Sequence, residues 1–399
     1  MKPIRTAIIP AVLLPLIFAT WMSAVPQFTN QTLHGGDLVL EGWGGVNYGS
    51  YNLLTSTNLA LPQGKWTSAA TNIFASNGLF ALTNAITPSM GQHYYAVHAL
   101  SSSNSLWIPI CGAWLGAEVT NGATRDFTDE ETRIGRQLDI LRIYHGAGGW
   151  TALTSEEKTY IAAGRKLLVS FKPNSSWANA GGGDSTVNIQ MKTLAQSIAS
   201  VAPSNLMVCI WHEPENDVIT NGGSAGTTAQ YVSMWTNVQH IFSVNGATNV
   251  IWFWIIENYS KFWGSLPELW PGNTNVDWVG WDVYQGSSSE NYVSAQTTAY
   301  NHMVTTSNPA NNYLSKPWAW TEWGVGINGY TPSVADQTNT FKAVNTALNN
   351  DQFPKIKCVA YFDISGPSAP NATSAILPGA QSAYNVLANS PYLLQQCPQ

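Results

Sequence analysis

The sequence predicts a (β/α)8 barrel that is preceded by a small all-β module. Three observations support this fold class: eight apolar, strand-like runs follow residue 106, helical stretches separate them, and residues 25–103 show no helical periodicity. Eight buried strands that alternate with helices close into a parallel barrel. The runs lie at residues 107–114, 139–144, 166–171, 205–211, 249–256, 276–284, 317–322 and 356–362.

An open, doubly wound sheet is the alternative arrangement of the same elements. Such a sheet usually carries a Gly-rich phosphate loop after its first strand, and residues 112–116, Gly-Ala-Trp-Leu-Gly, do not have that pattern. The predicted helix starts agree with the alternation of strands and helices. Thr128, Thr154 and Thr227 are each followed three residues later by Glu or Gln, which is the pattern of a capping box.

Residues 1–24 are predicted to be a signal peptide. Lys2 and Arg5 precede an apolar stretch at residues 7–19, and the small residues Ser23 and Ala24 offer a cleavage site. A transmembrane anchor is the alternative, but the stretch is short for a span and contains two prolines. We therefore expect a secreted, extracellular protein with no membrane association after the signal peptide is removed.

Residues 25–103 are predicted to form a β-rich accessory module followed by a linker. The segment is rich in Thr, Asn, Ser and Gly, and its short alternating runs are separated by turn residues. It contains no cluster of carboxylates, so we assign it no chemistry. Attachment, carbohydrate binding and a passive role all remain open for it. The Ser-rich residues 101–105 are the candidate linker to a second domain at 104–399.

Composition narrows the classes of ligand. The net charge is −6 and no run of Lys or Arg occurs, so we do not expect nucleic acid as a partner. Only 10% of the residues are charged, and the chain has 18 Trp, which suits weakly charged, flat ligands such as sugars. Most of these Trp side chains are nevertheless expected in the core.

The cysteines indicate disulfides rather than a metal site. Cys111, Cys209, Cys358 and Cys397 match no metal-ligand spacing, and neither HxH nor HExxH occurs. We therefore expect no metal and no cofactor. An exported chain could form one or two disulfides, and the sequence does not reveal which cysteines pair. We expect a monomer.

Polar and aromatic residues follow the predicted strands, where a barrel carries its active site. Carboxylates, imidazoles and aromatic rings thus gather on one rim, while charges within the strands are few and Arg142 is the main exception. The rim residues are Trp114, His145, Lys172, 211–217, Trp252 and Trp254 of the fifth strand, 281–284, 321–323 and 361–363.

Glu213 and Glu322 end the fourth and seventh predicted strands. A glycosidase needs one carboxylic acid to protonate the leaving oxygen, and a retaining enzyme needs a second carboxylate to attack the anomeric carbon. Both carboxylates could instead be structural partners of Lys or Arg. Because such bases are scarce in this chain, unpaired carboxylates in an aromatic cleft favour a catalytic role.

Three segments together resemble glycoside hydrolase family 26. They are His212-Glu213, residues 278–284 (Trp-Val-Gly-Trp-Asp-Val-Tyr) and residues 321–324 (Thr-Glu-Trp-Gly). The similarity spans about residues 106–390. It implies a retaining barrel glycosidase, with β-mannan as the first expected substrate and β-xylan or β-glucan close behind. A carbohydrate-binding barrel that no longer catalyses is the alternative from a different class.

The resemblance also implies roles for individual residues. Glu213 would be the acid/base and Glu322 the nucleophile, while His212 would orient the nucleophile's side of the site. Tyr284 would donate a hydrogen bond to Glu322. The substrate-binding residues implied are His145, on the non-reducing side, Asp282 in the motif of the sixth strand, and Trp254, Trp281 and Trp323 as sugar platforms.

The sequence departs from the family pattern at three places. These departures leave the two glutamates unchanged and bear on which substrate is cleaved. Cys209 stands where mannan-cleaving members often have the Arg of Arg-Pro-x-His-Glu. Residues 214–216 read Pro-Glu-Asn where Met-Asn-Gly is frequent, and Val218 replaces an aromatic residue.

Glu213 and Glu215 both lie near the rim of the fourth strand. Strand alternation predicts that Cys209, Trp211 and Glu213 share one face with Met207. Pro214 then breaks the strand, so that Glu215 belongs to the following loop. We expect the Glu213 and Glu322 carboxyl groups to lie about 5–5.5 Å apart, as in a retaining pair, and Glu215 to turn to another partner.

Overall fold

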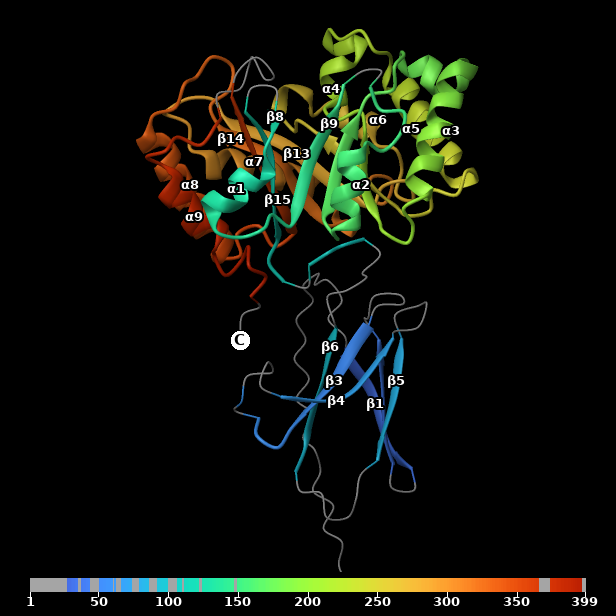
Figure 1. Cartoon of the computed structure of the whole chain (residues 1–399), viewed down its shortest axis with the longest axis vertical. Helices are drawn as coiled ribbons and strands as arrows, with labels where there is room; N and C mark the ends of the chain where they lie inside the picture. The colour runs from blue at the N-terminus through green and yellow to red at the C-terminus, as the bar shows by residue number, and fades with distance from the viewer. Residues whose placement is uncertain are drawn as a thin grey trace, which may run out of the picture. The chain divides into compact units, whose positions relative to one another are not determined.

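The chain divides into two compact units, one up to Ser102 and one from Ser103 onwards (Figure 1). The predicted signal peptide and the predicted linker lie outside the described residues. Among those residues, no helix is both long and apolar enough to cross a membrane. The structure is a computed structural model, and it describes residues 27–34, 37–43, 50–59, 61, 66–73, 79–85, 92–99, 106–109, 111–121, 124–146, 149–365 and 374–396.

The described part of the N-terminal unit contains two antiparallel sheets, which agrees with the predicted all-β module. One sheet has the order β1 (Gln27–His34), β2 (Asp37–Trp43) and β5 (Phe80–Ala85). The other has the order β4 (Thr67–Ile73), β3 (Ser50–Ser56) and β6 (Tyr94–Ala99). Leu40 and Leu82 of the first sheet share a small core with Tyr51 and Leu53 of the second.

The second unit is the predicted barrel. Eight parallel strands pair in chain order, and β15 closes the ring by pairing with β7. The antiparallel β8 (Thr124–Arg125) extends β7. The barrel strands are β7 (Trp114–Asn121), β9 (Ile140–His145), β10 (Lys166–Phe171), β11 (Leu206–Ile210), β12 (Val250–Ile256), β13 (Trp278–Gln285), β14 (Trp318–Val325) and β15 (Ile356–Ser365).

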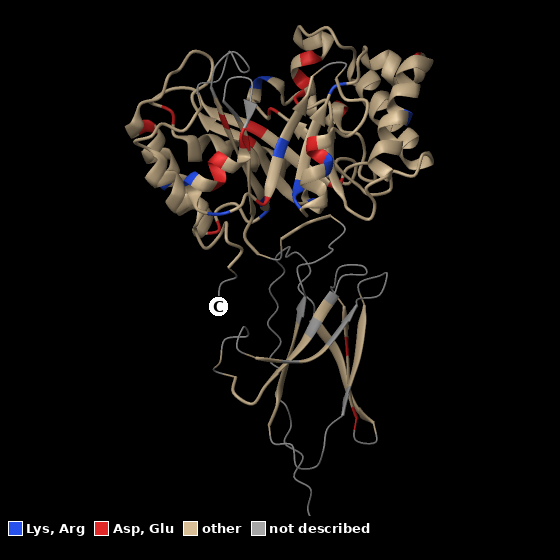
Figure 2. Ribbon diagram, in the orientation of Figure 1, with Lys and Arg blue, Asp and Glu red and all other residues tan. Residues whose placement is uncertain are grey.

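Helices cover the outside of the barrel, and acidic residues lie on its strands as well as on these helices (Figure 2). The α-helices are α1 (Phe127–Ile134), α2 (Ser155–Ala162), α3 (Ser185–Ala199), α4 (Pro214–Asp217), α5 (Thr228–Val244), α6 (Leu266–Leu269), α7 (Tyr292–Thr306), α8 (Val334–Asn349) and α9 (Gln381–Ala388). Shorter turns are η2 (Asn179–Gly183), η3 (Ile219–Asn221), η4 (Ser260–Phe262) and η5 (Tyr313–Ser315).

The first barrel strand does not lie where the sequence predicted it. β7 begins at Trp114, the residue at which the predicted strand ended, so Trp114 lies at the opposite end of the barrel from the expected rim. Leu106, Trp107 and Ile108 instead pack against the barrel's inner core. The Trp278 Nε1–H donates to the Leu106 carbonyl at 2.7 Å, and Gly112 has a left-handed φ of 62°. We call residues 106–108 the floor segment.

Side chains of the strands alternate between two cores. The inner core, inside the barrel, includes Ile140, Met207, Phe253 and Trp278. The outer core lies between strands and helices and contains most of the buried aromatic rings. Since successive side chains of a strand point to opposite faces, neighbouring residues belong to different cores.

Two of the three predicted capping boxes are confirmed. Thr154 caps α2 together with Glu157, and Thr227 caps α5 together with Gln230. The box predicted at Thr128 is wrong, because Asp126 is the N-cap of α1 and its side chain accepts the Asp129 N–H. α8 begins with a further box that the sequence analysis missed, formed by Ser333 and Asp336.

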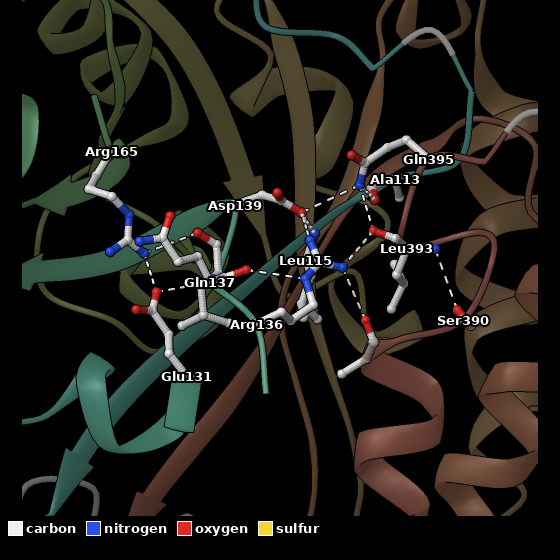
Figure 3. A network of polar contacts seen from close by, with 12 residues as sticks. Ala113, Leu115, Glu131, Arg136, Gln137, Asp139, Arg165, Ser390, Leu393 and Gln395 are labelled. Atoms are coloured by element: carbon white, nitrogen blue, oxygen red, sulfur yellow. Dashed lines mark hydrogen bonds and ion pairs between the residues drawn. The ribbon is translucent and has the colours of Figure 1, made fainter. Parts of the chain in front are cut away.

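A polar network joins the floor end of the barrel to its C-terminal segment (Figure 3). Arg136 pairs with Asp139 at 2.8 Å and donates to the carbonyls of Ala388 and Leu393. Gln395 donates to the Ala113 carbonyl at 2.9 Å. The two ends of the barrel's chain therefore lie side by side.

The cysteines take two different states. Cys111 forms a disulfide, whereas Cys209 and Cys358 are free thiols buried in the inner core. Cys397 lies outside the described residues.

Candidate active site

Three carboxyl groups meet at the C-terminal ends of the barrel strands. Glu213 lies three residues after the end of β11, Asp282 lies on β13 and Glu322 on β14. Each residue contributes one carboxyl oxygen to a group of three oxygens that all lie within 4.8 Å of one another. The structure therefore brings together both predicted catalytic glutamates and the predicted Asp282.

A bulge in β14 brings Glu322 beside Asp282. Trp281 pairs with Trp320, but Asp282 pairs with Glu322, so Thr321 is the extra residue. The Thr321 hydroxyl donates to Asp282 Oδ1 at 2.6 Å. Without this extra residue, regular alternation would turn Glu322 away from the inside of the barrel.

Two phenol groups hold Glu322, one on each oxygen. Tyr284 donates to Oε2 at 2.7 Å, which confirms the predicted hydrogen bond. Tyr144 donates to Oε1 at 2.5 Å. The sequence analysis missed Tyr144 because it took His145 as the polar end of the second strand. Alternation from the inward-facing Ile140 would have identified Tyr144 as an inward residue.

Arg142 lies beneath this arrangement and is fully buried. Its Cζ is 4.1 Å from the centre of the Tyr144 ring, and its Nη2 is 3.9 Å from Glu322 Oε1. The sequence marks Arg142 as an unusual charge within a predicted strand but does not indicate its role.

The backbone after β11 leaves the strand conformation before Glu213. Trp211 and Glu213 have left-handed φ values of 59° and 53°. Trp211 consequently packs in the outer core against Trp177 and donates to Asp217. The prediction that Trp211 shares the face of Cys209 and Glu213 is therefore wrong. Left-handed non-glycine residues are strained, and they are enriched at functional sites.

Glu215 turns away from the three carboxyl groups, as expected. It is fully buried, and its Oε1 accepts the Glu257 N–H at 2.7 Å and the Asn258 N–H at 3.2 Å. Burial raises the pKa of Glu215 to about 8. Glu215 therefore fastens the loop after β12 to the start of α4.

Burial and mutual repulsion favour the protonated forms of two of the three acids. Burial raises the pKa of Glu213 well above its ordinary value, and the charge of Glu322 raises it further. The same two causes raise the pKa of Asp282. Oxygen ligands at this spacing would suit a hard cation, which would have to displace these protons in order to bind. The electrostatics thus suit a proton donor at Glu213.

His212 and His145 have different surroundings. Burial lowers the pKa of His212 well below its ordinary value, so the imidazole is neutral, and its ring lies edge-on to Tyr144 at 5.3 Å. His145 points toward α2, where it hydrogen-bonds Glu157 at 2.7 Å and stacks on Trp150. Strand alternation separates it from Tyr144, so the structure does not bring His145 to the three carboxyl groups.

The prediction that Trp254, Trp281 and Trp323 are sugar platforms is wrong. Trp254 and Trp281 are 0% exposed and Trp323 is 1% exposed, and all three lie in the outer core. Alternation turns Trp254 and Trp281 outwards, and the Trp281 Nε1–H donates to Gln296 of α7. The bulge at Thr321 turns Trp323 outwards. Phe362, half-buried between Tyr144 and Tyr284, is the aromatic ring that borders the site.

Comparisons with known proteins support the barrel fold. No family model matches the chain. A GH26 β-mannanase from Bacteroides ovatus superposes with a TM-score of 0.52 at 18% identity, covering 70% of this chain and 89% of its own. GH26C from Muricauda sp. MAR_2010_75 gives a TM-score of 0.52 at 14% identity, covering 74% and 90%. At these identities, the two superpositions show that the chain shares the barrel fold of these structures.

One curated relative matches part of the chain. Endoglucanase H of Acetivibrio thermocellus is 24% identical over 221 residues. The match covers 50% of this chain but only 23% of the relative, so the chain corresponds to about a quarter of that protein's length.

Proposed function

We propose that this protein is a retaining endo-β-glycanase of glycoside hydrolase family 26, with Glu213 as acid/base and Glu322 as nucleophile. The distance between their closest oxygens carries the proposal. At most 4.8 Å separates these two oxygens, which supports carboxyl groups near the ~5–5.5 Å separation of retaining pairs rather than the ~6.5–9.5 Å of inverting pairs. The phenol groups on both oxygens of Glu322 support its role as the oriented nucleophile.

The reaction would proceed in two displacements. In the first, Glu322 attacks the anomeric carbon, the glycosidic bond breaks, and Glu213 gives its proton to the leaving oxygen. In the second, Glu213 takes a proton from water, and the water oxygen attacks the anomeric carbon and releases Glu322. The raised pKa of Glu213 supports its role as the proton donor at the start of the cycle.

β-Mannan is the first proposed substrate and β-glucan the second. The two solved structures compared above are described as a GH26 β-mannanase and as GH26C, whereas the curated relative is described as an endoglucanase. The departures near the acid/base favour testing both. Val218, which stands where mannan-cleaving members have an aromatic residue, is fully buried and offers no ring to a sugar. β-Xylan belongs in the same test.

The test is a reducing-sugar assay on β-mannan, mixed-linkage β-glucan and β-xylan. We expect hydrolysis of at least one, and Glu322→Ala should lower turnover by about 10³-fold or more because covalent catalysis is lost. Glu268→Ala, which removes an exposed carboxylate of α6, is the matched control and should leave the rate unchanged. A chelator should also leave it unchanged. Near-normal turnover by Glu322→Ala would refute the assignment.

A non-catalytic carbohydrate-binding barrel is the second candidate. It would bind one of these polysaccharides, yet release no reducing ends with the wild-type chain. Both glutamates and the Tyr284 contact favour the enzyme. We further propose that the protein is exported by an N-terminal signal peptide, acts as a monomer and has the polysaccharide as its partner. Sequencing the N-terminus of the protein from the culture medium would test export.

A further inference from the structure

Arg142 is a buried cation whose hydrogen bonds are incomplete. Its side chain is fully buried on β9, and Nη1 donates to the Leu168 carbonyl at a long 3.4 Å. Nε and Nη2 have no hydrogen-bond partner in the part of the chain that the structure describes. Burying a charge in this way is costly unless a nearby anion offsets the lost hydration. A carboxylate close to Arg142 is therefore needed to offset the cost of burying its charge.

The geometry identifies Glu322 as that anion. Arg142 Nη2 lies 3.9 Å from Glu322 Oε1, and the guanidinium carbon lies 4.1 Å from the centre of the Tyr144 ring. Tyr144 donates its hydroxyl to the same Oε1. Because Arg142 and Tyr144 are two residues apart on β9, both point into the barrel. Two residues of β9 thus lie against Oε1 of Glu322, while Tyr284 of β13 donates to Oε2.

We propose that Arg142 is a positioning residue for the nucleophile, acting with Tyr144 as one unit that holds Glu322 ionised and oriented through Oε1. The inference rests on the proposed function. In the first displacement the carboxylate gives up its charge as the bond to the anomeric carbon forms. In the second, that carbon–oxygen bond breaks and the electron pair returns to Glu322, so negative charge develops again beside the guanidinium. A fixed positive charge stabilises this departure.

Three other acidic groups surround Glu322. Glu213 faces it from the end of β11, Glu257 from the end of β12 and Asp282 from β13, and a negative charge on any of them opposes the ionisation of Glu322. Tyr144 and Tyr284 supply neutral hydrogen bonds. Lys172 acts on Glu213 and Lys261 on Glu257, whereas Arg142 is the cation that forms an ion pair with Glu322, and it also interacts with Asp282.

The test measures how covalent labelling of Glu322 depends on pH. The probes are the dinitrophenyl 2-deoxy-2-fluoro-β-glycosides of cellobiose, mannobiose and xylobiose, and mass spectrometry locates the label. Their leaving group needs no proton, so the acidic limb of the labelling rate reports the nucleophile and not Glu213. The variants are Arg142→Met, Arg142→Lys and, as a matched control, Lys166→Met. Lys166 is also a strand cation over an aromatic ring, 4.5 Å from Trp114, at the floor end.

We expect Arg142→Met to move the acidic limb up by about one pH unit or more, because an opposite charge within ~4–6 Å shifts a titration by that amount. Release of the fluoroglycosyl label should slow about tenfold. Arg142→Lys keeps the charge and should remain within about half a pH unit of the wild type. Lys166→Met should match the wild type in both measurements.

The outcomes separate the inference from the proposed function. If none of the three probes labels Glu322 of the wild type, the proposed function fails and the inference fails with it. If the wild type is labelled and Arg142→Met keeps the wild-type acidic limb, the inference alone is overturned. If Arg142→Met does not fold, Tyr144→Phe decides, because it removes half of the unit and keeps the cation. It should raise the acidic limb and slow release, and an unchanged profile would overturn the inference.

Discussion

Glu213 adopts a left-handed backbone, a conformation that a glutamate rarely takes. Its N–H donates to the Ile255 carbonyl at 3.0 Å, and Pro214 begins α4 immediately after it. These contacts offset the strain and direct the carboxyl group toward Glu322. Glu215, two residues later, has the same chemistry but holds a loop together. Backbone conformation, rather than residue type, separates the two roles.

The different roles of Glu213 and Glu215 predict that a small nucleophile will restore turnover to a variant of Glu213. Glu213→Ala should still react quickly with an activated aryl glycoside, because such a leaving group needs little protonation. Its second displacement should be slow, and added azide should restore turnover as a nucleophile that needs no base. Release of aryl alcohol with and without azide measures both effects. Rescue of Glu215→Ala, but not of Glu213→Ala, would reverse the two roles.

Glu215 also predicts a dependence of stability on pH. Its pKa in the folded protein is about 8, above the ~4.5 of an exposed glutamate. The unfolded chain therefore releases this proton first, and the wild type loses stability as the pH rises from about 4.5 to about 8. Glu215→Gln keeps an oxygen for the two N–H groups but has no charge. It should be more stable than the wild type by about 2–4 kcal/mol at pH 8, and much less so at pH 5.

Thermal unfolding at the two pH values checks this prediction. Glu268→Gln, at an exposed position on α6, controls for the loss of one surface charge. Equal differences between Glu215→Gln and the wild type at pH 5 and pH 8 would contradict the prediction.

At the scale of elements, the helix starts offer a comparison of two identical sequence patterns. Thr154 accepts the Glu157 N–H, whereas Thr128 lies inside α1, one residue past its start. Thr154→Ala should lower the free energy of unfolding by about 1–2 kcal/mol, because a helix N-cap is lost. Thr128→Ala should change it by less than about 0.5 kcal/mol. Urea titrations of the two variants measure this difference, and equal losses would mean that Thr128 also caps its helix.

The elements also show what the sequence could predict. Seven of the eight predicted strand runs share five or more residues with their barrel strands, because long apolar runs and their turn signals are local properties, whereas the first run shares only Trp114. The first strand was misplaced because the apolar floor segment looks like a strand until its contact with Trp278 is known. The bulge at Thr321 could not be predicted either, because it depends on how β14 pairs with β13. This bulge determines the direction in which the Trp323 side chain points.

The residues of the candidate site could likewise be predicted only where the local sequence marks them. Glu213, Glu322 and Tyr284 were predicted because short motifs mark them. Tyr144 and Arg142 were not assigned, because their role depends on three strands meeting inside a closed barrel.

At the scale of the whole molecule, the floor segment determines where the barrel unit begins. A chain that starts at Ser103 keeps Leu106, Trp107 and Ile108, and it should fold and retain activity on soluble substrate. A chain that starts at Ala113 leaves the inner core open at the floor and also lacks Cys111. Its melting temperature should fall by about 5 °C or more. Calorimetry and activity of both chains test this, and an inactive or insoluble Ser103 chain would place the boundary elsewhere.

The closeness of the barrel's two chain ends has a consequence for how such an enzyme can be extended or rearranged. Ala113 donates its N–H to the Tyr392 carbonyl, and Gln395 reaches back to Ala113. Both ends thus leave the barrel at the face opposite the three carboxyl groups. A fusion partner attached at either end starts away from the path of a polysaccharide. A short loop joining the ends would give a circular permutant, with new termini available on any floor-side connection.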